Sequence, residues 1–427
     1  MTIDLTVPSY LILGIVAYYG LLFALSLRAV VPAGGGDGPP PMFVVLVPAR
    51  NEVLVLADTL ANLTSLDRPD RIRVLVVDDG STDGTEAIIA AVVRADPRVR
   101  ALRRPPEHSG TGKSDVLNEG YRAVRSWSRA GDGWLGGTRV EDIVLAIVDA
   151  DGRLEPGVVG ALAPYFGDRR VGSVQIAVEI ANAGASTLAR MQDIEFVGFS
   201  CLVQVARDRI GSSGLGGNGQ FTRLVALTGL GDAPWSSGAL TEDLDLGLKL
   251  VEAGWRTRFC RETVVGQQGL RQWRPLLRQR TRWTQGHYQC WSHVWPLARA
   301  RDVPLVARID LIAYLLLVVT VLLVSLTMLV TVLAAVGLVS VTDGFLAFLP
   351  EGPAKRALSL LLSVLPLAIF MATYQRYGRR PFAWFELPAF GLLFTAYTYV
   401  WFWTTLRAFT RMLLRRGSWV KTPRVAD

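Results

Sequence analysis

The sequence contains few of the residues that build disulfide frameworks or histidine-rich metal sites. Only three cysteines (Cys201, Cys260 and Cys290) and three histidines occur in 427 residues. The cysteines form no C-x-x-C pair, so a disulfide framework and a zinc-ribbon spacing are both excluded. Charged residues are also scarce, at 19%, whereas hydrophobic residues make up 50%. This composition excludes a disordered chain and argues against an entirely water-soluble enzyme.

The charge that is present is mainly positive. The formal net charge is +8, and most of the positive residues are arginines. Such a charge suits an anionic membrane surface or a ligand that carries phosphate groups. No DNA- or RNA-binding motif accompanies it, so nucleic acid is not an expected partner.

Four long apolar stretches without a charged residue are 5–27, 311–342, 357–375 and 387–406. Each approaches the roughly 20 residues that a membrane-spanning helix needs. Residues 1–31 are expected to be a retained N-terminal transmembrane anchor, because a basic n-region and a clear cleavage site are lacking. Residues 309–406 are expected to form a C-terminal transmembrane region with about three apolar segments. The pattern predicts an integral protein of the plasma membrane whose catalytic domain is cytosolic.

The basic segments near these stretches give conflicting topologies. One anchor followed by three spans would place the C-terminus outside, yet the basic tail 407–427 favours the cytosolic side. The arginine-rich loop 376–380 favours the cytosolic side as well. Either one segment is re-entrant or the long one is broken near Gly337. Residues 286–308 mix tryptophan and arginine and are expected to form an interfacial helix.

Between the anchor and these segments the sequence is typical of a globular α/β domain. A Gly- and Pro-rich linker occupies residues 32–41, and the domain is expected over 42–285. Its β-branched runs read as strands buried on both faces, as in a largely parallel sheet. The expected strands are 42–47, 72–77 and 143–148, and the expected helices are 53–65, 84–95, 113–125 and 241–253.

Polar motifs follow two of these strands directly. P-A-R-N-E occupies 48–52 and D-D-G-S occupies 78–81. In a doubly wound sheet, ligands bind outside the carboxyl ends of the strands, so both motifs open onto one edge. Turn chemistry is an equally good explanation of these residues when they are taken alone. The next motif, S-G-T-G-K-S, is no P-loop, because Glu107 stands where that loop needs glycine. Lys113 within it is either a cation for phosphate or a solvated lysine.

Three later motifs carry candidate catalytic side chains. Asp149 and Asp151 follow a buried strand, and residues i and i+2 of an extended chain point the same way. Their mutual repulsion would be relieved by a bound Mg²⁺ or Mn²⁺ with diphosphate oxygens. T-E-D (241–243) is either a helix N-cap or a site for a general base. Q-R-T-R-W (279–283) offers arginine for a diphosphate and tryptophan for a sugar ring, or a basic face toward lipid headgroups.

The order of these motifs, together with G-K-S-D-V-L-N, resembles that of membrane-bound family 2 glycosyltransferases. Cellulose, hyaluronan, chitin and poly-N-acetylglucosamine synthases belong to that family. The resemblance covers residues 42–285, and the membrane arrangement extends it to most of the chain. It implies a GT-A fold, with a Rossmann-like, mixed and mostly parallel α/β sheet plus transmembrane helices. It also implies inverting transfer of a hexose from a nucleoside-diphosphate sugar, with a UDP-sugar expected first.

The resemblance also implies roles on the donor side. Ala49, Glu52 and Asp79 match positions that hold the nucleoside, and Lys113 matches a lysine that contacts the donor. Arg282 matches the arginine that binds the diphosphate.

The metal and the acceptor side follow in the same way. Asp149 and Asp151 match the D-x-D that binds the divalent ion and the diphosphate, with Asp151 the more direct ligand. Asp243 matches the general base, and Glu242 beside it is placed on the acceptor side. The acceptor end is expected to lie against these further residues: Gln279 and Trp283.

Two functions remain open within this family. The first is extension of a β-linked polysaccharide at the membrane, which Q-R-T-R-W favours. The alternative is a non-processive transferase that acts on a polyprenyl-phosphate or glycolipid acceptor. The Gly-rich stretch 216–221 departs from the cellulose synthase pattern, and the few apolar segments suggest a homo-oligomer, a short product or a lipid-linked acceptor. A transporter is disfavoured because the apolar runs contain no charge and no repeat.

Overall fold

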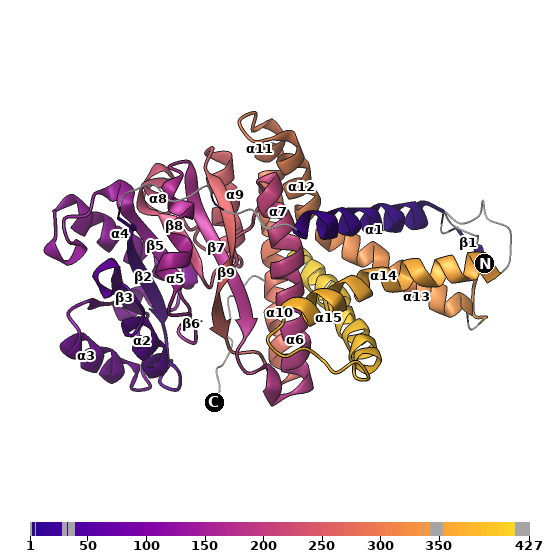
Figure 1. Cartoon of the computed structure of the whole chain (residues 1–427), viewed down its shortest axis with the longest axis horizontal. Coiled ribbons are helices and arrows are strands. Elements are labelled where there is room, and N and C mark those ends of the chain that lie inside the picture. Colours follow the sequence, from indigo (N-terminus) through magenta and orange to yellow (C-terminus); the bar gives the residue numbers. More distant parts are fainter. Residues whose placement is uncertain are drawn as a thin grey trace.

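The computed structural model describes residues 2–4, 6–27, 32, 39–335, 337–341 and 353–414. Most of the linker predicted at 32–41 and most of the basic tail predicted at 407–427 lie outside these residues. Figure 1 shows a sheet-containing domain at one side and a group of long helices at the other.

The main sheet has eight strands in the order β4-β3-β2-β5-β8-β7-β9-β6. In chain order the strands are β2 (Met42–Ala49), β3 (Ile72–Asp78), β4 (Val99–Arg103), β5 (Ile143–Ile147), β6 (Arg153–Leu154), β7 (Val171–Ile180), β8 (Gln220–Arg223) and β9 (Arg256–Gln267). The neighbours β4, β3, β2 and β5 are parallel, as are β7 and β9, whereas β8 is antiparallel to both β5 and β7. The prediction of a mixed, mostly parallel sheet is therefore confirmed.

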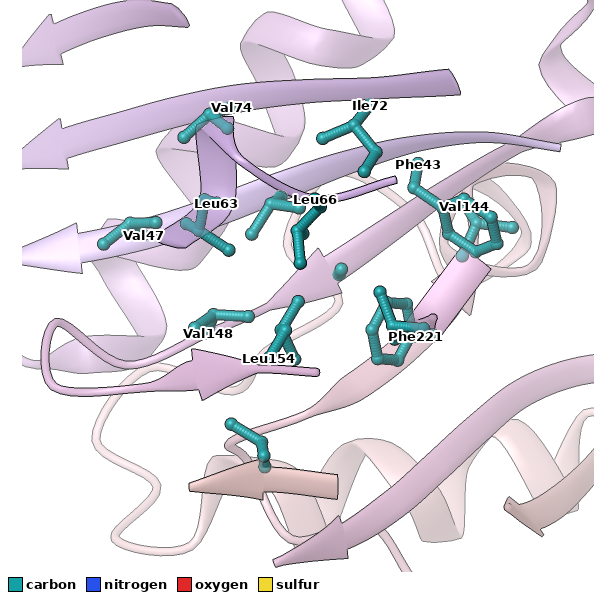
Figure 2. Packing of buried hydrophobic residues seen from close by; sticks show 14 of the residues in the cluster. Phe43, Val47, Leu63, Leu66, Ile72, Val74, Val144, Val148, Leu154 and Phe221 are labelled. Carbon is teal, nitrogen blue, oxygen red and sulfur yellow. The ribbon is translucent and has the colours of Figure 1, made fainter. Parts of the chain in front are cut away.

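Both faces of this sheet are covered, and two of its strands, β2 and β5, are apolar at every position. Alternate residues of β2 point to opposite faces. One face packs with α2 (Leu56–Thr64), and Figure 2 shows part of this core around Phe43, Val47 and Leu63. The other face packs with α4 (Lys113–Arg129) through residues such as Val44 and Leu46. The predicted continuous burial of strands 42–47, 72–77 and 143–148 is confirmed.

Helix α4 approaches the sheet closely because it carries a glycine at the contact. A Cβ on Gly120 would lie 2.3 Å from Leu46 Cδ2. The close approach fixes α4 against β2, and the first residue of α4 is Lys113.

The remaining helices of the catalytic part and of the chain ends have these bounds. They are α1 (Thr6–Ser26), α3 (Thr85–Ala95), α5 (Val158–Leu162), α6 (Thr187–Gly198), α7 (Val205–Ile210), α8 (Leu224–Gly229), α9 (Glu242–Glu252), α10 (Trp273–Gln289), α11 (Val294–Arg299), α12 (Leu305–Leu315), α13 (Leu317–Ala335), α14 (Pro353–Tyr377) and α15 (Leu387–Leu413). A π-helical stretch, Phe199–Gln204, joins α6 to α7. A small parallel pair joins β1 (Thr2–Ile3) to β10 (Ser340–Val341).

The segment expected as one interfacial helix over 286–308 is divided into several pieces. Helix α10 continues to Gln289, a 3-10 turn follows at Cys290–His293, and α11 ends at Arg299. Helix α12 begins only after Pro304, whose ring cannot continue a helix in its interior. The long apolar run is broken at Leu316 between α12 and α13, and Gly337 lies beyond the end of α13.

Three of the long helices, α1, α13 and α14, project together away from the sheet (Figure 1). In the part of the chain that the structure describes, no single helix is both long and apolar enough to cross a bilayer. One bent pair, Leu305–Leu315 with Leu317–Thr327, meets both conditions together, with 56° between its halves.

Candidate active site

The first two polar motifs meet at the carboxyl edge of the sheet. Strands β2 and β3 are parallel and in register, so Ala49 lies opposite Asp78. The backbone N–H of Asp79 donates to the Ala49 carbonyl oxygen over 2.8 Å. Asn51 adopts φ 53° at the end of this turn, and its N–H donates to Ser81 Oγ over 2.9 Å. The two motifs therefore form one continuous rim.

Asp79 is buried in this rim and is bound by positively charged and N–H groups. Arg104 Nη1 lies 2.6 Å from Asp79 Oδ1, and Arg50 Nη1 lies 3.5 Å from Oδ2. The Gly110 N–H donates to the same carboxylate at 3.0 Å. Asp79 thus anchors the turn that leads to Lys113. Glu52 is buried nearby, and its backbone N–H donates to Thr85 Oγ1 over 2.8 Å.

Lys113 connects three of the sequence motifs. Its Nζ lies 2.6 Å from Asp149 Oδ1, after β5, and 3.4 Å from Glu242 Oε1, at the start of α9. Burial works to lower the pKa of Lys113, but the carboxylates of Asp149, Glu242 and Asp243 outweigh it and raise that pKa. The lysine therefore stays charged and holds carboxylates from separate elements around one point.

Asp243 lies at the same point, beside the Gly-rich stretch. Burial, together with the neighbouring Glu242 carboxylate, raises the pKa of Asp243 to about 7, although Lys113 opposes this. A Cβ on Gly217 would lie 3.1 Å from Asp243 Oδ2 and 3.6 Å from Lys113 Nζ. Gly217 also has φ 76°, which favours glycine. A carboxyl group with such a pKa is suited to general-base work near neutral pH.

The D-A-D turn is held by the same Gly-rich stretch and by the end of β9. The Asp149 N–H donates to Asn218 Oδ1 over 3.1 Å. Asp151 is buried, and its Oδ2 accepts from the N–H of Gln268 over 3.0 Å. Asn218 in turn donates through Nδ2 to Gln267 Oε1 over 3.2 Å. The two aspartates are thus fixed on a single turn next to Lys113.

These two carboxylates match the ligands that a hard divalent ion prefers. Among the described residues, no group of three or more His, Cys, Asp or Glu side chains is arranged to hold a metal. Mg²⁺ is commonly bound through one or two carboxylates plus substrate phosphates rather than by an all-protein cage. Asp149 and Asp151 fit that mode, in which the donor itself completes the coordination.

Helix α10 packs directly on the turn that precedes Asp243. Arg282 Nη1 donates to the Leu240 carbonyl oxygen over 3.1 Å, and the Leu240 N–H donates to Gln289 Oε1 over 3.0 Å. A Cβ on Gly286 would lie 2.4 Å from Thr241 Oγ1 and 2.7 Å from its backbone nitrogen. Only glycine permits this approach, so α10 and the start of α9 are held together.

A histidine fixes α9 from its other side. His293 Nε2 lies 3.0 Å from Asp245 Oδ1, and its Nδ1 lies 2.8 Å from Glu252 Oε1. Burial works to lower the pKa of His293, but hydrogen bonds to both carboxylates raise it to about 9. Burial likewise opposes ionisation of Asp245, and its hydrogen bonds to His293, Lys249 and Ser236 lower its pKa to about 2. This charged pair stabilises the helix that carries Asp243.

The other predicted residues of Q-R-T-R-W lie toward α6 and α15. The Trp283 ring stacks on Trp401 of α15, with centroids 6.5 Å apart, and meets Phe196 of α6 edge-on at 6.2 Å. Gln279 Oε1 accepts from Arg280 Nη1 over 3.1 Å. The structure thus brings together Lys113, Asp149, Glu242 and Asp243, while Gln279 and Trp283 line the boundary with the long helices.

Sequence reasoning gave no role to Arg280, which is fully buried beside Trp283. Its Nη2 lies 2.7 Å from Glu195 Oε2, and its guanidinium carbon lies 4.1 Å from the Trp283 ring centroid. Trp401 Nε1 also donates to Glu195 Oε1 over 2.9 Å. The only sequence signal was an arginine inside the motif, and its ion partner lies 85 positions away. Asn218 and Gly217 were noted only as part of a Gly-rich stretch.

Comparisons with known proteins identify a family for this chain. The family model described as "Glycosyltransferase like family 2" matches residues 39–286. A β-monoglucosyldiacylglycerol synthase of Synechocystis sp. is 30% identical over 70% of this chain and 61% of its own length. An enzyme of the same name from Nostoc sp. is 30% identical over 66% of this chain and 56% of its length. The chain therefore spans about six tenths of the length of these curated relatives.

Two further similarities come from more distant proteins. An N-acetylglucosaminyltransferase of Rhizobium meliloti is 30% identical over 61% of this chain and 59% of its own length. A solved mannosyltransferase from Pyrobaculum calidifontis, in complex with GDP-Man and Mn²⁺, aligns with a TM-score of 0.64. It is 19% identical, and the alignment covers 96% of this chain and 98% of that one. This likeness shows the fold.

Proposed function

Because the chain belongs to the glycosyltransferase-like family 2, we propose that it transfers a hexose with inversion to the hydroxyl of a diacylglycerol-type lipid. The donor is a nucleoside-diphosphate sugar, with UDP-glucose the first to test. The observation that carries the proposal is Lys113, which holds Asp149 and Glu242 together beside Asp243. This places the predicted donor-binding carboxylate, the predicted base and a fixed cation at one sheet edge.

The proposed acceptor is a lipid, which is the alternative that the sequence analysis left open, and not a growing polysaccharide. The similar proteins of Synechocystis and Nostoc are named as synthases of a glucosylated diacylglycerol. Their names support a lipid acceptor and a single transfer. The exposed apolar residues of α12 and α13, such as Leu305 and Ile309, support the same choice, because they would bring the site close to lipid.

The reaction requires a base, compensation of the leaving charge and alignment of the two substrates. Asp243 accepts the proton of the lipid hydroxyl group. The oxygen of that hydroxyl attacks the anomeric carbon at the same time, from the face opposite the diphosphate. The carbon–oxygen bond to the diphosphate breaks in the same step, which inverts the configuration. Lys113 and Arg282 place positive charge near the departing diphosphate, and Glu242 supports the orientation of Lys113.

Asp149 and Asp151 would hold the divalent ion, Mg²⁺ or Mn²⁺. When bound, the ion offsets the negative charge of the diphosphate and so makes it a better leaving group. The solved mannosyltransferase is in complex with GDP-Man and Mn²⁺. We expect chelation with EDTA to stop transfer and either ion to restore it. Undiminished transfer after thorough chelation would remove the metal role from these two aspartates.

The direct test uses the purified full-length chain in detergent with radiolabelled UDP-glucose and diacylglycerol. We expect a labelled glycolipid with one hexose, together with one UDP released for each lipid. A panel of other UDP- and GDP-sugars should be compared in the same assay, since pocket shape sets the choice of sugar. A product that extends over many hexose units without lipid would overturn the lipid acceptor and favour a polysaccharide.

Arg280 and Glu195 enter the proposal as positioning residues. Arg280 lies over the Trp283 ring and is held there by Glu195, and Trp401 stacks on Trp283. Trp283 is thereby held at the boundary between the carboxylate site and the long helices, where a lipid headgroup would arrive. In this proposal, Trp283 contacts the headgroup of the acceptor lipid.

A further inference from the structure

We propose that Arg207 of α7 selects the acceptor, by donating hydrogen bonds from its two Nη groups to an ester carbonyl oxygen of the diacylglycerol-type lipid. Arg207 is then a specificity-determining residue on the acceptor side. This inference rests on the proposed function, because it names the part of the acceptor lipid that one buried side chain binds. Helices α7 and α12 meet where the sheet domain joins the long helices (Figure 1).

The first reason is that Arg207 is buried with most of its donors unused. Its side chain is fully enclosed, and its Nε lies 2.7 Å from Asp310 Oδ2 of α12. Neither Nη1 nor Nη2 has a hydrogen-bond partner among the residues that the structure describes. Buried polar groups are normally hydrogen-bonded, because leaving them unpaired costs free energy. The Nη groups are therefore available to an oxygen atom of a ligand.

The unused groups lie beside the Gly-rich stretch that leads to the proposed base. A Cβ on Gly214 would lie 3.6 Å from Arg207 Nη1, and a Cβ on Gly217 would lie 3.1 Å from Asp243 Oδ2. The two glycines are three residues apart in the sequence, so at most about 10 Å of chain separates them. A small lipid headgroup can therefore present its hydroxyl to Asp243 and a second oxygen to Arg207.

Hydrogen bonds fix the Gly-rich stretch next to Arg207. Gln204, the last residue of the π-helical stretch, donates through Nε2 to the Gly214 carbonyl oxygen over 2.8 Å. Its Oε1 accepts from the Gly214 N–H over 3.1 Å, and the Ser212 N–H donates to the Arg207 carbonyl oxygen over 2.9 Å. Single π-helical turns are frequent at functional sites. The position of Arg207 relative to this stretch is thus set before an acceptor arrives.

Helices α10 and α12 form another side of the same region. The guanidinium carbon of Arg207 lies 4.2 Å from the centroid of the Tyr314 ring. His287 lies one turn beyond Trp283 on α10, and its ring centroid is 4.9 Å from that of Tyr314. The charges of Arg207 and of Asp243 both act on Tyr314, so both groups lie close to this one ring. Arg207 therefore belongs to the boundary at which the acceptor is proposed to arrive.

The charges around Arg207 favour a neutral oxygen over a phosphate. Asp310 compensates the positive charge of Arg207, and its Oδ1 accepts from the Tyr18 hydroxyl over 2.6 Å. Burial lowers the pKa of His287; its hydrogen bond with the Tyr314 carbonyl opposes this, and the charge of Arg207 adds to the lowering. His287 therefore stays neutral and supplies no further positive charge. An ester carbonyl accepts hydrogen bonds without the negative charge that would repel Asp310.

Two acceptors that differ only in their carbonyl groups test this role. The purified full-length chain in detergent receives UDP-glucose with either dioleoylglycerol or the matching dialkylglycerol, whose ether linkages lack carbonyl oxygens. We expect kcat/KM to be about tenfold higher for the ester lipid, because the ether lipid loses hydrogen bonds to a charged donor. In Arg207→Met, the value for the ester lipid should fall to that for the ether lipid, with the KM for UDP-glucose unchanged.

Two further variants separate this effect from a loss of folding. Arg207→Met leaves the buried carboxylate of Asp310 without its partner. The double variant Arg207→Met with Asp310→Leu replaces the whole pair by apolar side chains, a change that is often neutral for stability. It should also use both lipids equally. Arg209→Met changes an exposed position of the same helix and should keep the preference of the parent chain.

The ratio of the two kcat/KM values decides the question. A parent chain that uses both lipids equally, or a double variant that keeps the preference, would overturn the role of Arg207 and leave the glycolipid function intact. A polyprenyl phosphate that reacts faster than dioleoylglycerol would overturn the choice of a carbonyl oxygen. If the parent chain glucosylates neither glycerol lipid, the proposed function is wrong and this inference is wrong with it.

Discussion

The sheet domain buries almost all of its large apolar side chains, whereas the long helices leave many of theirs exposed. Within residues 42–267, Val53 and Leu54 are the exposed large hydrophobic side chains, although strands β2 and β5 are apolar throughout. Outside that range the exposed set is much larger and includes Trp295, Trp384 and Leu393. Burial of apolar surface from water stabilises the first region, whereas the second region leaves much of its apolar surface exposed.

Charged groups divide between the two regions in a complementary way. At the sheet edge, Arg104 forms an ion pair with Asp79 and Lys113 forms one with Asp149. At the boundary, the ion pair of Arg280 with Glu195 lies among aromatic rings, including Trp283. In the proposed function, the donor binds at the sheet domain and the acceptor arrives at the boundary with the long helices.

The largest expected effect comes from changing the sheet edge alone. Asp243→Asn should lower the turnover number by roughly 10²- to 10⁴-fold, the range for loss of a general base. The affinity for UDP should stay nearly unchanged, because the diphosphate is bound by other groups. Steady-state kinetics and calorimetric UDP binding measure the two quantities. A normal turnover number in this variant would remove Asp243 from the base role.

The second-largest effect is expected at the boundary between the sheet domain and the long helices. Arg280→Met should lower the free energy of unfolding by about 3 kcal/mol, because it leaves Glu195 without its buried partner. It should also raise the KM for the lipid acceptor while leaving the KM for the sugar donor unchanged. Arg278→Met, at an exposed position of the same helix, is the matched control. Equal effects of both variants, or an equal change for donor and acceptor, would contradict the positioning role.

A smaller effect is the dependence of kcat/KM on pH, which again concerns Asp243 at the sheet edge. Because the pKa of Asp243 is raised to about 7, the carboxyl is protonated below that pH and cannot accept a proton. We expect kcat/KM to fall about tenfold for each pH unit below the pKa and to level off above it. Initial rates measured in mixed buffers from about pH 5 to about pH 9 give the pH profile of kcat/KM. A flat profile with unchanged UDP binding would exclude this titration.

The smallest effect compares two exposed leucines. Leu392→Gln on α15 should lower the unfolding free energy in lipid nanodiscs by about 1 kcal/mol, because the side chain loses apolar contact with lipid. Leu54→Gln should leave it unchanged, since water already surrounds that side chain in the sheet domain. The difference is measured by thermal unfolding in nanodiscs. Identical behaviour of the two variants would mean that α15 does not face lipid.

Much of the sheet domain could be predicted because its pattern is local. The expected strands 42–47 and 72–77 correspond to β2 and β3, and the expected helix 241–253 corresponds to α9 at Glu242–Glu252. Continuous apolar runs and helical periodicity depend on neighbouring residues alone. The family match and the solved mannosyltransferase also confirm the predicted GT-A fold class.

The remaining features depend on contacts between distant residues. Strand β8 was not predicted because its buried residues Gln220, Thr222 and Arg223 are polar and carry no strand signal. The partnership of Arg280 with Glu195 spans 85 positions, and that of α15 with α10 spans more than 100. The contacts that pack α15 on α10, through Tyr397 and Arg411, likewise join residues far apart in the sequence. The roles assigned to Ala49, Glu52, Asp79 and the other site residues stay predictions.

Gly286 fixes the distance between α10 and the turn before α9. With no room for even a methyl group against Thr241, the helix bearing Arg282 and Trp283 has a single permitted distance from the turn bearing Asp243. A laboratory that wishes to graft a new acceptor helix onto this scaffold must therefore transplant the facing turn with it. Helix α10 and the turn that precedes Asp243 can be exchanged only together.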